Sequence, residues 1–368
     1  MVFAAVEKGI GLLGGVSGFA GPGEKILLKP NVLLGGNPDA CVTTHPAVFI
    51  AVGKLLQQAG AKIYYGDSSA IGKCEGNMRR AGYKKAADEL GFIIADFDAG
   101  RAVTYKDALL VKNFTIANGV LDSDGLVSLP KLKTHALSRL TGAIKNQFGC
   151  VPGLNKSQFH VKLPDPYDFC TMLVDINTFI RPRLCVMDGI MAMEGNGPRG
   201  GKPRKLGVLL FSTDPVAIDA VAARIIKLDP EFIPTSKPGE LSGLGTYHSE
   251  KIELAGDSLE SFVTPGFDVV RSAPVRCSSG GLRNFLKNQI CEKPVINKAK
   301  CTACGTCVKM CPVDPKAVDW HKGDKSKPPS YKYGRCIRCF CCQEVCPEGA
   351  ISIVKPVLAN VISRTQIG

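Results

Sequence analysis

Eight cysteines near the C-terminus form two copies of one spacing. Each copy has the pattern C-x-x-C-x-x-C-x-x-x-C-P, closed by Pro312 and Pro347. Three thiolates in one tight loop bind three irons of a [4Fe–4S] cubane, and the fourth cysteine ligates the other cluster. The spacing therefore predicts two [4Fe–4S] clusters with exchanged fourth ligands. The first is assigned to Cys301, Cys304, Cys307 and Cys346, and the second to Cys336, Cys339, Cys342 and Cys311.

A pair of zinc knuckles is the competing interpretation. Structural zinc takes four ligands as two C-x-x-C pairs, which gives no reason for a third cysteine at the same spacing. The doubled pattern instead resembles that of bacterial two-cluster ferredoxins. Cys341, beside the ligand Cys342, is expected to be a thiol outside the ligand set, with ligand exchange between the two as the alternative.

The composition favours a globular chain of two domains. The chain has 368 residues, of which 45% are hydrophobic and 40 are glycine, which suits an α/β core with a small second domain. No run of 18 apolar residues occurs, so we expect no membrane span. Sixteen cysteines, half of them in the two runs, indicate a reducing cytoplasm rather than a disulfide scaffold. Exposed cubanes also favour an anaerobic setting.

The basic charge is concentrated near the cysteine runs. The formal net charge is +13, and residues 293–368 have thirteen Lys and Arg against five Asp and Glu. This surplus suits an acidic redox partner protein. No helix-turn-helix, zinc finger or aromatic RNA-binding motif accompanies it, so we expect no nucleic-acid partner.

Strand and helix signals alternate through the first 255 residues. The predicted strands and helices follow one another, as in a mostly parallel sheet covered by helices. The predicted strands are 25–29, 62–65, 92–96, 125–129, 184–187 and 206–211, and the predicted helices are 46–59, 79–90, 169–180 and 215–228. We therefore predict an α/β domain at 1–255, a connection at 256–294, a small α+β ferredoxin-like domain at 295–355 and a tail at 356–368. The connection contains a predicted Ser-Ser-Gly-Gly turn at Ser278.

Lysines and polar side chains follow several predicted strands. Lys29, Lys133, His135 and Lys145 belong to this group, and ligands of open α/β sheets bind beyond the carboxyl ends of strands. We expect these four residues to hold an anionic substrate. Asp219 lies in an apolar helix and needs a partner, so we assign proton transfer to His135 or Asp219. Solvated loop positions for Lys29 and Lys133, and a buried ion pair of Lys145 with Asp219, are the structural alternatives.

The usual cofactor and hydrolase signatures are missing. No G-x-G-x-x-G follows the first strand, and neither a P-loop nor a G-x-S-x-G motif occurs. A metal or cofactor site in the α/β domain, built from His135, His160 and acidic residues, remains a further interpretation.

The motifs of the first domain, taken in order, resemble the family called domain of unknown function 362. The stretches that match are Lys29-Pro30-Asn31, Lys131-x-Lys133-Thr134-His135, Thr141-Gly142-x-x-Lys145-Asn146-x-Phe148-Gly149, Met193-Glu194-Gly195-x-Gly197-Pro198 and Asp214-Pro215-Val216-Ala217-x-Asp219-Ala220. The resemblance implies an α/β fold with a fused ferredoxin domain and no established reaction. The family opens with a strand before its first helix, whereas Met1 leads directly into that helix. We therefore expect either a late start codon or a sheet without that strand.

These observations lead to three hypotheses of function. The first is an iron–sulfur oxidoreductase, or reductive activator, whose ferredoxin domain exchanges low-potential electrons with an anionic substrate in the α/β domain. The second is an electron carrier or a cluster or cofactor maturation factor whose α/β domain binds a partner. The third is a metal- or cofactor-bearing α/β domain. A pocket lined by these basic residues and close to one iron–sulfur cluster would favour the first hypothesis. A pocket far from both clusters would favour the second.

Overall fold

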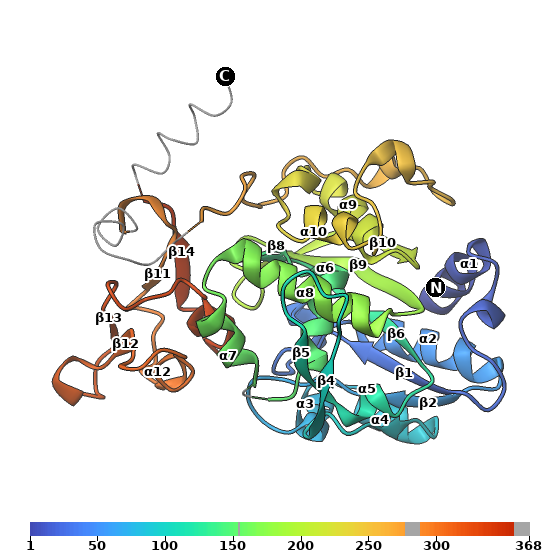
Figure 1. Ribbon diagram of the computed structural model, residues 1–368, viewed down its shortest axis with the longest axis horizontal. Coiled ribbons are helices and arrows are strands. Elements are labelled where there is room, and N and C mark those ends of the chain that lie inside the picture. The colour runs from blue at the N-terminus through green and yellow to red at the C-terminus, as the bar shows by residue number, and fades with distance from the viewer. Residues whose placement is uncertain (154, 277–287, 357–368) are drawn as a thin grey trace.

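The computed structural model describes residues 1–153, 155–276 and 288–356, so the predicted turn at Ser278 and nearly all of the predicted tail lie outside it. A mostly parallel sheet of eight strands forms the centre, as predicted (Figure 1). Its order is β3-β2-β1-β6-β9-β7-β8, with β10 antiparallel on β9. The strands are β1 Lys25–Pro30, β2 Lys62–Tyr65, β3 Ile93–Ile94, β6 Gly125–Leu129, β7 Lys131–His135, β8 Arg139–Leu140, β9 Leu184–Glu194 and β10 Lys202–Ser212.

The long strand β9 joins two stretches of the sheet. Its start pairs with β6 and its end pairs with β7, both in parallel. The amide of Asp188 in β9 donates to Pro130 O, between β6 and β7, over 2.9 Å. Residues 125–135 therefore run along β9 almost without a break. The motif Lys131–His135 was expected to be a loop because of its polar side chains, but it is a buried strand.

Helices surround this sheet. They are α1 Val2–Leu12, α2 Pro46–Gln58, α3 Cys74–Arg80, α4 Lys84–Glu89, α5 Asn118–Leu121, α6 Gly142–Asn146, α7 Asn155–Lys162, α8 Pro166–Ile180, α9 Pro215–Ile225 and α10 Ser236–Leu241. α2, α8 and α9 each have proline at the first position after a capping side chain, the arrangement that favours helix initiation. The single helix predicted at 79–90 is wrong: α3 ends before Gly82, whose φ of 82° is unsuited to a helix, and α4 follows. The hairpin of β4 Gly100–Thr104 and β5 Asn113–Ala117 was not predicted.

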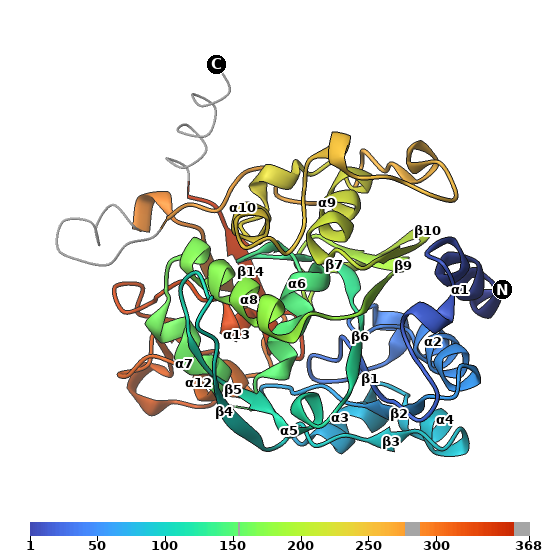
Figure 2. The ribbon, with the colours of Figure 1, turned by 45° about the vertical axis from the view of Figure 1, so that its right-hand side comes forward.

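The cysteine runs lie in a small module at one end of the molecule (Figures 1 and 2). β11 Lys293–Ile296 pairs with β14 Ile351–Val354, and β12 Val318–Asp319 pairs with β13 Ser330–Tyr331. Each cysteine run contains one short helix, α12 Thr306–Lys309 or α13 Cys341–Glu344. We call residues 288–356 the ferredoxin module.

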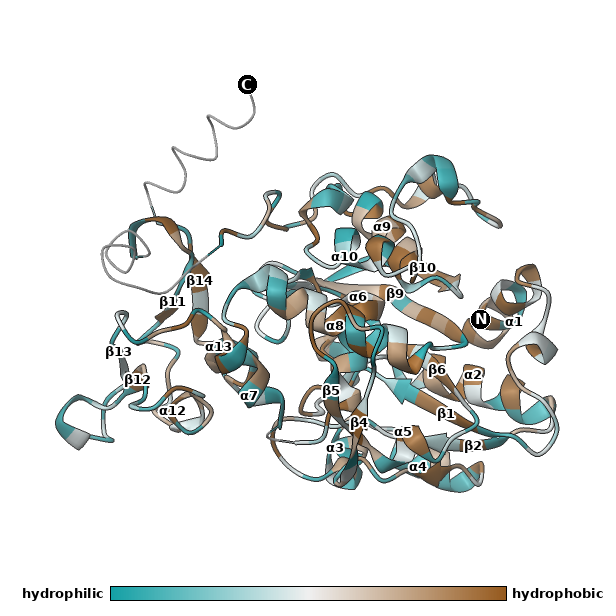
Figure 3. Cartoon of the chain, viewed as in Figure 1, coloured by the Kyte–Doolittle hydropathy of each residue, from teal (hydrophilic) through white to brown (hydrophobic). Residues whose placement is uncertain are grey.

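The apolar side chains are concentrated in the α/β domain. Figure 3 shows hydrophobic colour along β1, β6 and β9, whereas the loops near β12 and β13 are mostly hydrophilic. β1 is buried at every residue after Lys25, as expected for a strand covered on both faces. Among the described residues, no helix has the length and apolar character needed to cross a bilayer.

Candidate functional site

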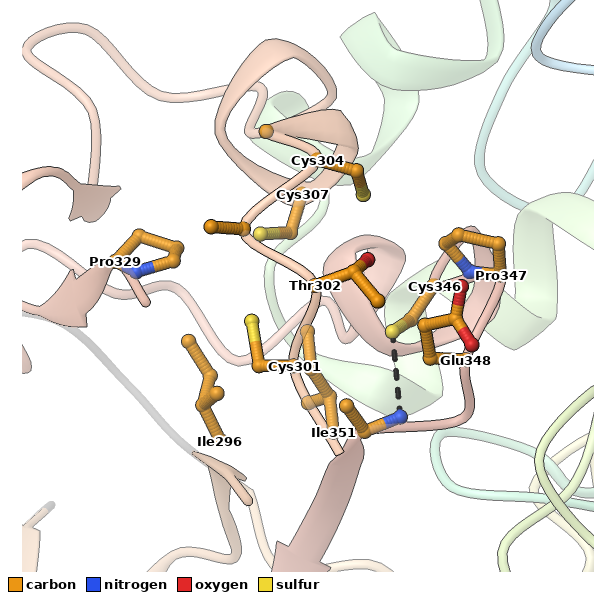
Figure 4. A pocket seen from close by; sticks show the side chains of 13 residues that line it. Ile296, Cys301, Thr302, Cys304, Cys307, Pro329, Cys346, Pro347, Glu348 and Ile351 are labelled. Atoms are coloured by element: carbon orange, nitrogen blue, oxygen red, sulfur yellow. Dashed lines mark hydrogen bonds between the residues drawn. The ribbon is translucent and has the colours of Figure 1, made fainter. Parts of the chain in front are cut away.

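Four cysteines of the first predicted set line one hollow of the ferredoxin module. Cys301, Cys304 and Cys307 come from the first run, and Cys346 comes from the second (Figure 4). Ile296, Pro329 and Ile351 add apolar walls. The amide of Ala350 donates to Cys346 Sγ over 3.3 Å. A donor set of four thiols with apolar walls and an amide aimed at sulfur fits a [4Fe–4S] cubane, and it contains the exchanged fourth cysteine that the spacing predicts.

The second set is more enclosed. Cys311, Cys336 and Cys342 are buried in the apolar centre of the module, and Cys339 is half-buried. The Tyr331 hydroxyl is 3.1 Å from Cys342 Sγ, and the amide of Ala317 donates to Cys311 Sγ over 3.4 Å. These donors also suit cluster thiolates. The assignment of the eight cysteines as ligands stays a prediction.

No three His, Cys, Asp or Glu side chains of the described residues are gathered closely enough to hold a metal ion directly. Zinc draws its ligand atoms to about 2.0–2.3 Å from one centre, whereas a cubane separates its four thiolates at the corners of a larger body. The preference for clusters over zinc rests on the doubled C-x-x-C-x-x-C-x-x-x-C-P spacing.

The two cysteine runs share one backbone path but differ in side chains. Ala303 and Arg338 have φ of 54° and 64°, and Gly305 and Phe340 have φ of 74° and 62°. Both pairs occupy equivalent places, 35 positions apart, so the left-handed geometry is repeated. The second run places a bulky arginine and phenylalanine where the first has Ala303 and Gly305. The side chains differ because the second run faces the α/β domain.

Three side chains of the second run make that contact. Phe340 is 5% exposed and belongs to the apolar core of the α/β domain. Gln343 Nε2 donates to Asn196 Oδ1 over 2.9 Å and to Gly197 O over 2.8 Å. Glu344 Oε1 is 2.9 Å from His135 Nε2. The second cysteine run is thus fixed against the carboxyl end of β7.

His135 uses both ring nitrogens at this junction. Its Nδ1 lies 3.1 Å from the amide of Leu137 and 3.3 Å from that of Ser138, both of which donate to it. The proton therefore lies on Nε2, which donates to Glu344. Burial, assisted by Lys145, lowers the pKa of His135 to about 4. Burial raises the pKa of Glu344, but nearby Lys145 and His135 outweigh it and hold that pKa below its ordinary value. The contact is a neutral imidazole donating to a carboxylate.

Lys29 lies at the end of β1 in a buried ion pair. Its Nζ is 2.8 Å from Asp67 Oδ1, and neither side chain is appreciably exposed. Asp67 also accepts from the amide of Val32 over 3.1 Å. A Cβ on Gly149 would overlap Asp67 and Lys29, so this position requires glycine. The motif residue Lys29 is therefore a partnered charge at the site and not a solvated loop residue. Lys131 and Asp188 form a second buried pair over 2.6 Å.

Three further lysines have no carboxylate within ion-pair distance among the residues that the structure describes. Lys133 Nζ donates to Val42 O over 2.6 Å, and burial followed by the charge of Lys145 lowers its pKa well below the ordinary value. Lys145 in α6 is half-buried. Lys156 in α7 is 9% exposed, and its Nζ has no hydrogen-bond partner. Burial lowers the pKa of Lys156 to about 7.

These lysines form one electrostatic group. Lys145 acts on the pKa of Lys133, His135, Lys156 and Glu344. Unpaired buried cations are costly, so the group favours an anion. We call Lys133, Lys145 and Lys156 the lysine cluster.

Several buried polar atoms at the strand ends have no hydrogen-bond partner among the described residues. A buried donor or acceptor without a partner costs about 1–3 kcal/mol, so such atoms indicate water or a ligand in the working protein. The atoms at this edge of the sheet without a partner in the described chain are Asn31 Oδ1, Thr43 Oγ1, Ser69 Oγ, Thr141 Oγ1, Gln147 Nε2 and Lys156 Nζ.

Asp219 contacts a helix start and not a lysine. Its Oδ1 accepts from the amide of Ala143 over 2.6 Å, and its Oδ2 accepts from that of Ile144 over 3.2 Å. Gly142 has a φ of 59°, and a Cβ there would overlap the Asp219 carboxylate. Burial raises the pKa of Asp219 to about 7. Its position is explained by capping α6, and its proton-transfer role stays a prediction.

Two family models match separate stretches of the chain. The model of the family "Domain of unknown function (DUF362)" matches residues 26–224, and that of a 4Fe-4S dicluster domain matches residues 293–347. The chain belongs to the DUF362 family. A thylakoid-associated protein of Synechocystis sp. is 41% identical over 239 residues, which is 65% of this chain and 74% of the relative.

Two relatives resemble the dicluster end of this DUF362 protein. One is an NAD(P)H-quinone oxidoreductase subunit I of Gloeobacter violaceus, 29% identical over 27% of this chain and 51% of its own length. The other is an uncharacterized ferredoxin of Methanocaldococcus jannaschii, 34% identical over 17% of this chain and 80% of its own length. The DUF362 domain is thus joined to a ferredoxin-like iron–sulfur domain that is homologous to electron-transfer proteins.

The sequence prediction did not include two residues of the candidate site, Lys156 and Glu344. Lys29, Lys133, His135 and Lys145 lie at one edge of the sheet, as predicted, whereas Asp219 lies behind α6. Nothing in the sequence pointed to Lys156, because a lysine in the first turn of a polar helix resembles a surface residue. The sequence did contain a signal for Glu344, because the equivalent position of the first run is Lys309, of opposite charge. A comparison of the two runs, position by position, would have indicated the face that docks on the DUF362 domain.

Proposed function

We propose that this protein is an iron–sulfur oxidoreductase that exchanges electrons between its dicluster domain and a small anionic substrate held by the lysine cluster. The observation that carries the proposal is the His135–Glu344 contact of 2.9 Å. It fixes the second cysteine run beside the strand ends at which α/β sheets bind ligands. A reductase or a reductive activator needs this proximity, and a carrier does not.

Each cluster, once bound, supplies one-electron chemistry. The chain contributes the enclosure of the second cluster, because Phe340 and Gln343 close the seam between module and domain. It also contributes donors toward the anion. Charge-assisted hydrogen bonds are worth about 1.5–3 kcal/mol each, and the lysine cluster supplies three amino groups that can donate them. A bound anion also favours the protonated forms of Lys133 and Lys156.

Proton transfer is assigned to titratable residues of the α/β domain. His135 and Asp219 are the candidates from the sequence, and both already bond to neighbours. Lys156 joins them, because a pKa of about 7 suits a general acid at neutral pH. In this proposal the lysine cluster binds the anion and Lys156 is placed to deliver a proton.

The remaining partners follow from charge. We propose an acidic redox partner protein for the basic ferredoxin module and a cytoplasmic location. The carrier or maturation factor is the second candidate, and it requires that the α/β domain bind a protein instead of a small anion.

Native mass spectrometry of anaerobically purified protein tests the proposal. The wild-type protein should retain a small anionic molecule, and Lys145→Met should lose it while keeping iron content and melting temperature. Lys54→Met is the control, because Lys54 is an exposed lysine of α2 and does not belong to the lysine cluster. A stability loss in Lys145→Met with no bound molecule in either protein would favour the carrier.

A further inference from the structure

The two cysteine runs differ most in their exposure to solvent. In the first run Cys304 is exposed, and Thr302 and Lys309 are exposed beside it. The equivalent Cys339, Ile337 and Glu344 of the second run are all half-buried. The α/β domain causes this difference, since Phe340 and Gln343 of the second run are buried against it. The first run has no such cover in the described structure.

Lysines surround the exposed run. Lys300 directly precedes Cys301, and Lys309 ends α12; both side chains are exposed. Lys325 Nζ lies 5.4 Å from the centre of the Trp320 ring, and that ring packs against Gly305 in the same run. Two exposed lysines thus flank the cysteines of the first run along the chain, and a third lies on a ring that contacts the same run.

The negative charge on this face is small. Glu348 lines the same hollow as Cys304, and Asp324 is paired with Lys327 over 3.2 Å. None of Lys300, Lys309 and Lys325 has an ion-pair partner in the part of the chain that the structure describes. A cluster of free cations beside an electron-transfer centre steers an acidic partner and raises its association rate.

We propose that the face formed by Lys300, Lys309, Lys325 and Cys304 is the docking surface for an acidic one-electron carrier protein. We call it the lysine face. The second cysteine run then serves the α/β domain and the first serves the outside partner. This inference rests on the part of the proposed function in which the ferredoxin module exchanges electrons with an acidic partner protein, and it adds where that partner binds. It does not depend on the anion site of the α/β domain.

Reduced flavodoxin, an acidic one-electron carrier, is the probe. The rate of cluster reduction is measured anaerobically over a range of salt concentrations for wild type and for Lys300→Glu/Lys309→Glu/Lys325→Glu. The matched control reverses three exposed lysines at the far end of the sheet, Lys25→Glu/Lys54→Glu/Lys62→Glu. Both variants change the net charge equally.

Reversal of the lysine face should slow reduction by about tenfold or more at low ionic strength, and the salt dependence should flatten. The control should stay close to wild type, and dithionite should reduce all three proteins alike. Carbodiimide cross-linking followed by mass spectrometry should join flavodoxin carboxylates to Lys300 or Lys309.

Equal slowing in both variants would show that net charge, and not the lysine face, governs association, and would overturn the inference. Unchanged rates in the reversed lysine face, or cross-links only at other lysines, would do the same. These measurements use no substrate. A failure here leaves the anion site untouched, and loss of the anion site leaves the flavodoxin reaction intact.

Discussion

His135 Nε2 lies 2.9 Å from Glu344 Oε1, which joins residues 209 positions apart in the chain. His135 ends β7 of the α/β domain, and Glu344 ends α13 of the ferredoxin module. The equivalent residue of the first cysteine run is Lys309, which has no such partner in the described chain. This contact, together with the hydrogen bonds of Gln343 to Asn196 and Gly197, distinguishes the docked half of the module from the free half.

Glu344→Ala should loosen the docking of the module. A hydrogen bond to a charged group contributes about 1.5–3 kcal/mol, and its loss should appear as faster hydrogen exchange at α13 and β7. Lys309→Ala is the matched control, since it truncates the equivalent position of the exposed run. Equal protection in both variants would mean that the contacts of Phe340 and Gln343 hold the module without the one between Glu344 and His135.

Phe340→Ala should destabilise the protein by about 3–5 kcal/mol, the usual cost of removing a buried aromatic ring. Phe340 is 5% exposed and belongs to the core of the α/β domain although it lies between two predicted cluster ligands. The melting temperature measures the effect. The control is Leu241→Ala, because Leu241 is 80% exposed and should change the melting temperature little.

The sequence predicted the regular elements well because their signals are local. The strands at 25–29, 62–65 and 125–129 follow from apolar runs. β7 was missed because its two lysines and its histidine are typical of an exposed loop. In the structure they lie in a buried strand, where Lys131 pairs with Asp188 and His135 contacts Glu344. Such partners are separated from β7 by 57 and 209 positions, and no periodicity shows them.

The candidate site was predicted in part for the same reason. Lys29, Lys133, His135 and Lys145 lie at strand ends or in the helix after them, which topology alone locates. Asp219 was assigned to proton transfer, with an ion pair to Lys145 as the structural alternative. In the structure its carboxylate accepts from the amides that start α6. An acidic residue in an apolar helix requires a partner, and the sequence cannot distinguish a lysine from a backbone amide.

Cys311→Ser should damage the cluster held by Cys336, Cys339 and Cys342 more than that of its own run. The reason is the exchanged fourth ligand, which has its counterpart in Cys346 beside Cys301 and Cys307. Iron analysis and spectra of the reduced protein measure the loss. Cys341→Ala, a neighbouring thiol outside the predicted ligand set, should keep the full iron content; loss of a cluster there would overturn the assignment.

Asp219→Asn should change how stability depends on pH. The Asp219 pKa rises from 3.8 to about 7 in the fold, so between these values the folded state binds more protons than the unfolded state. Wild-type stability should therefore fall, relative to Asp219→Asn, as pH rises from about 4 to about 7. Urea unfolding of both proteins at a series of pH values measures the difference. A constant difference would show that the amides of Ala143 and Ile144 keep Asp219 ionised throughout.

Lys156→Met should reveal a strained cation in the lysine cluster. Burial lowers the pKa of Lys156 from 10.5 to about 7, so above about pH 7 the unfolded chain binds more protons at this residue and folding becomes more favourable as pH rises. Methionine does not titrate, so the stability of the variant lacks this pH dependence. It should be more stable than wild type at pH 7, and its advantage should shrink toward pH 9. Lys54→Met, which removes an exposed lysine, should show no such trend. A loss of stability in Lys156→Met at every pH would mean that Lys156 is a paired structural residue and not a free cation of the anion site.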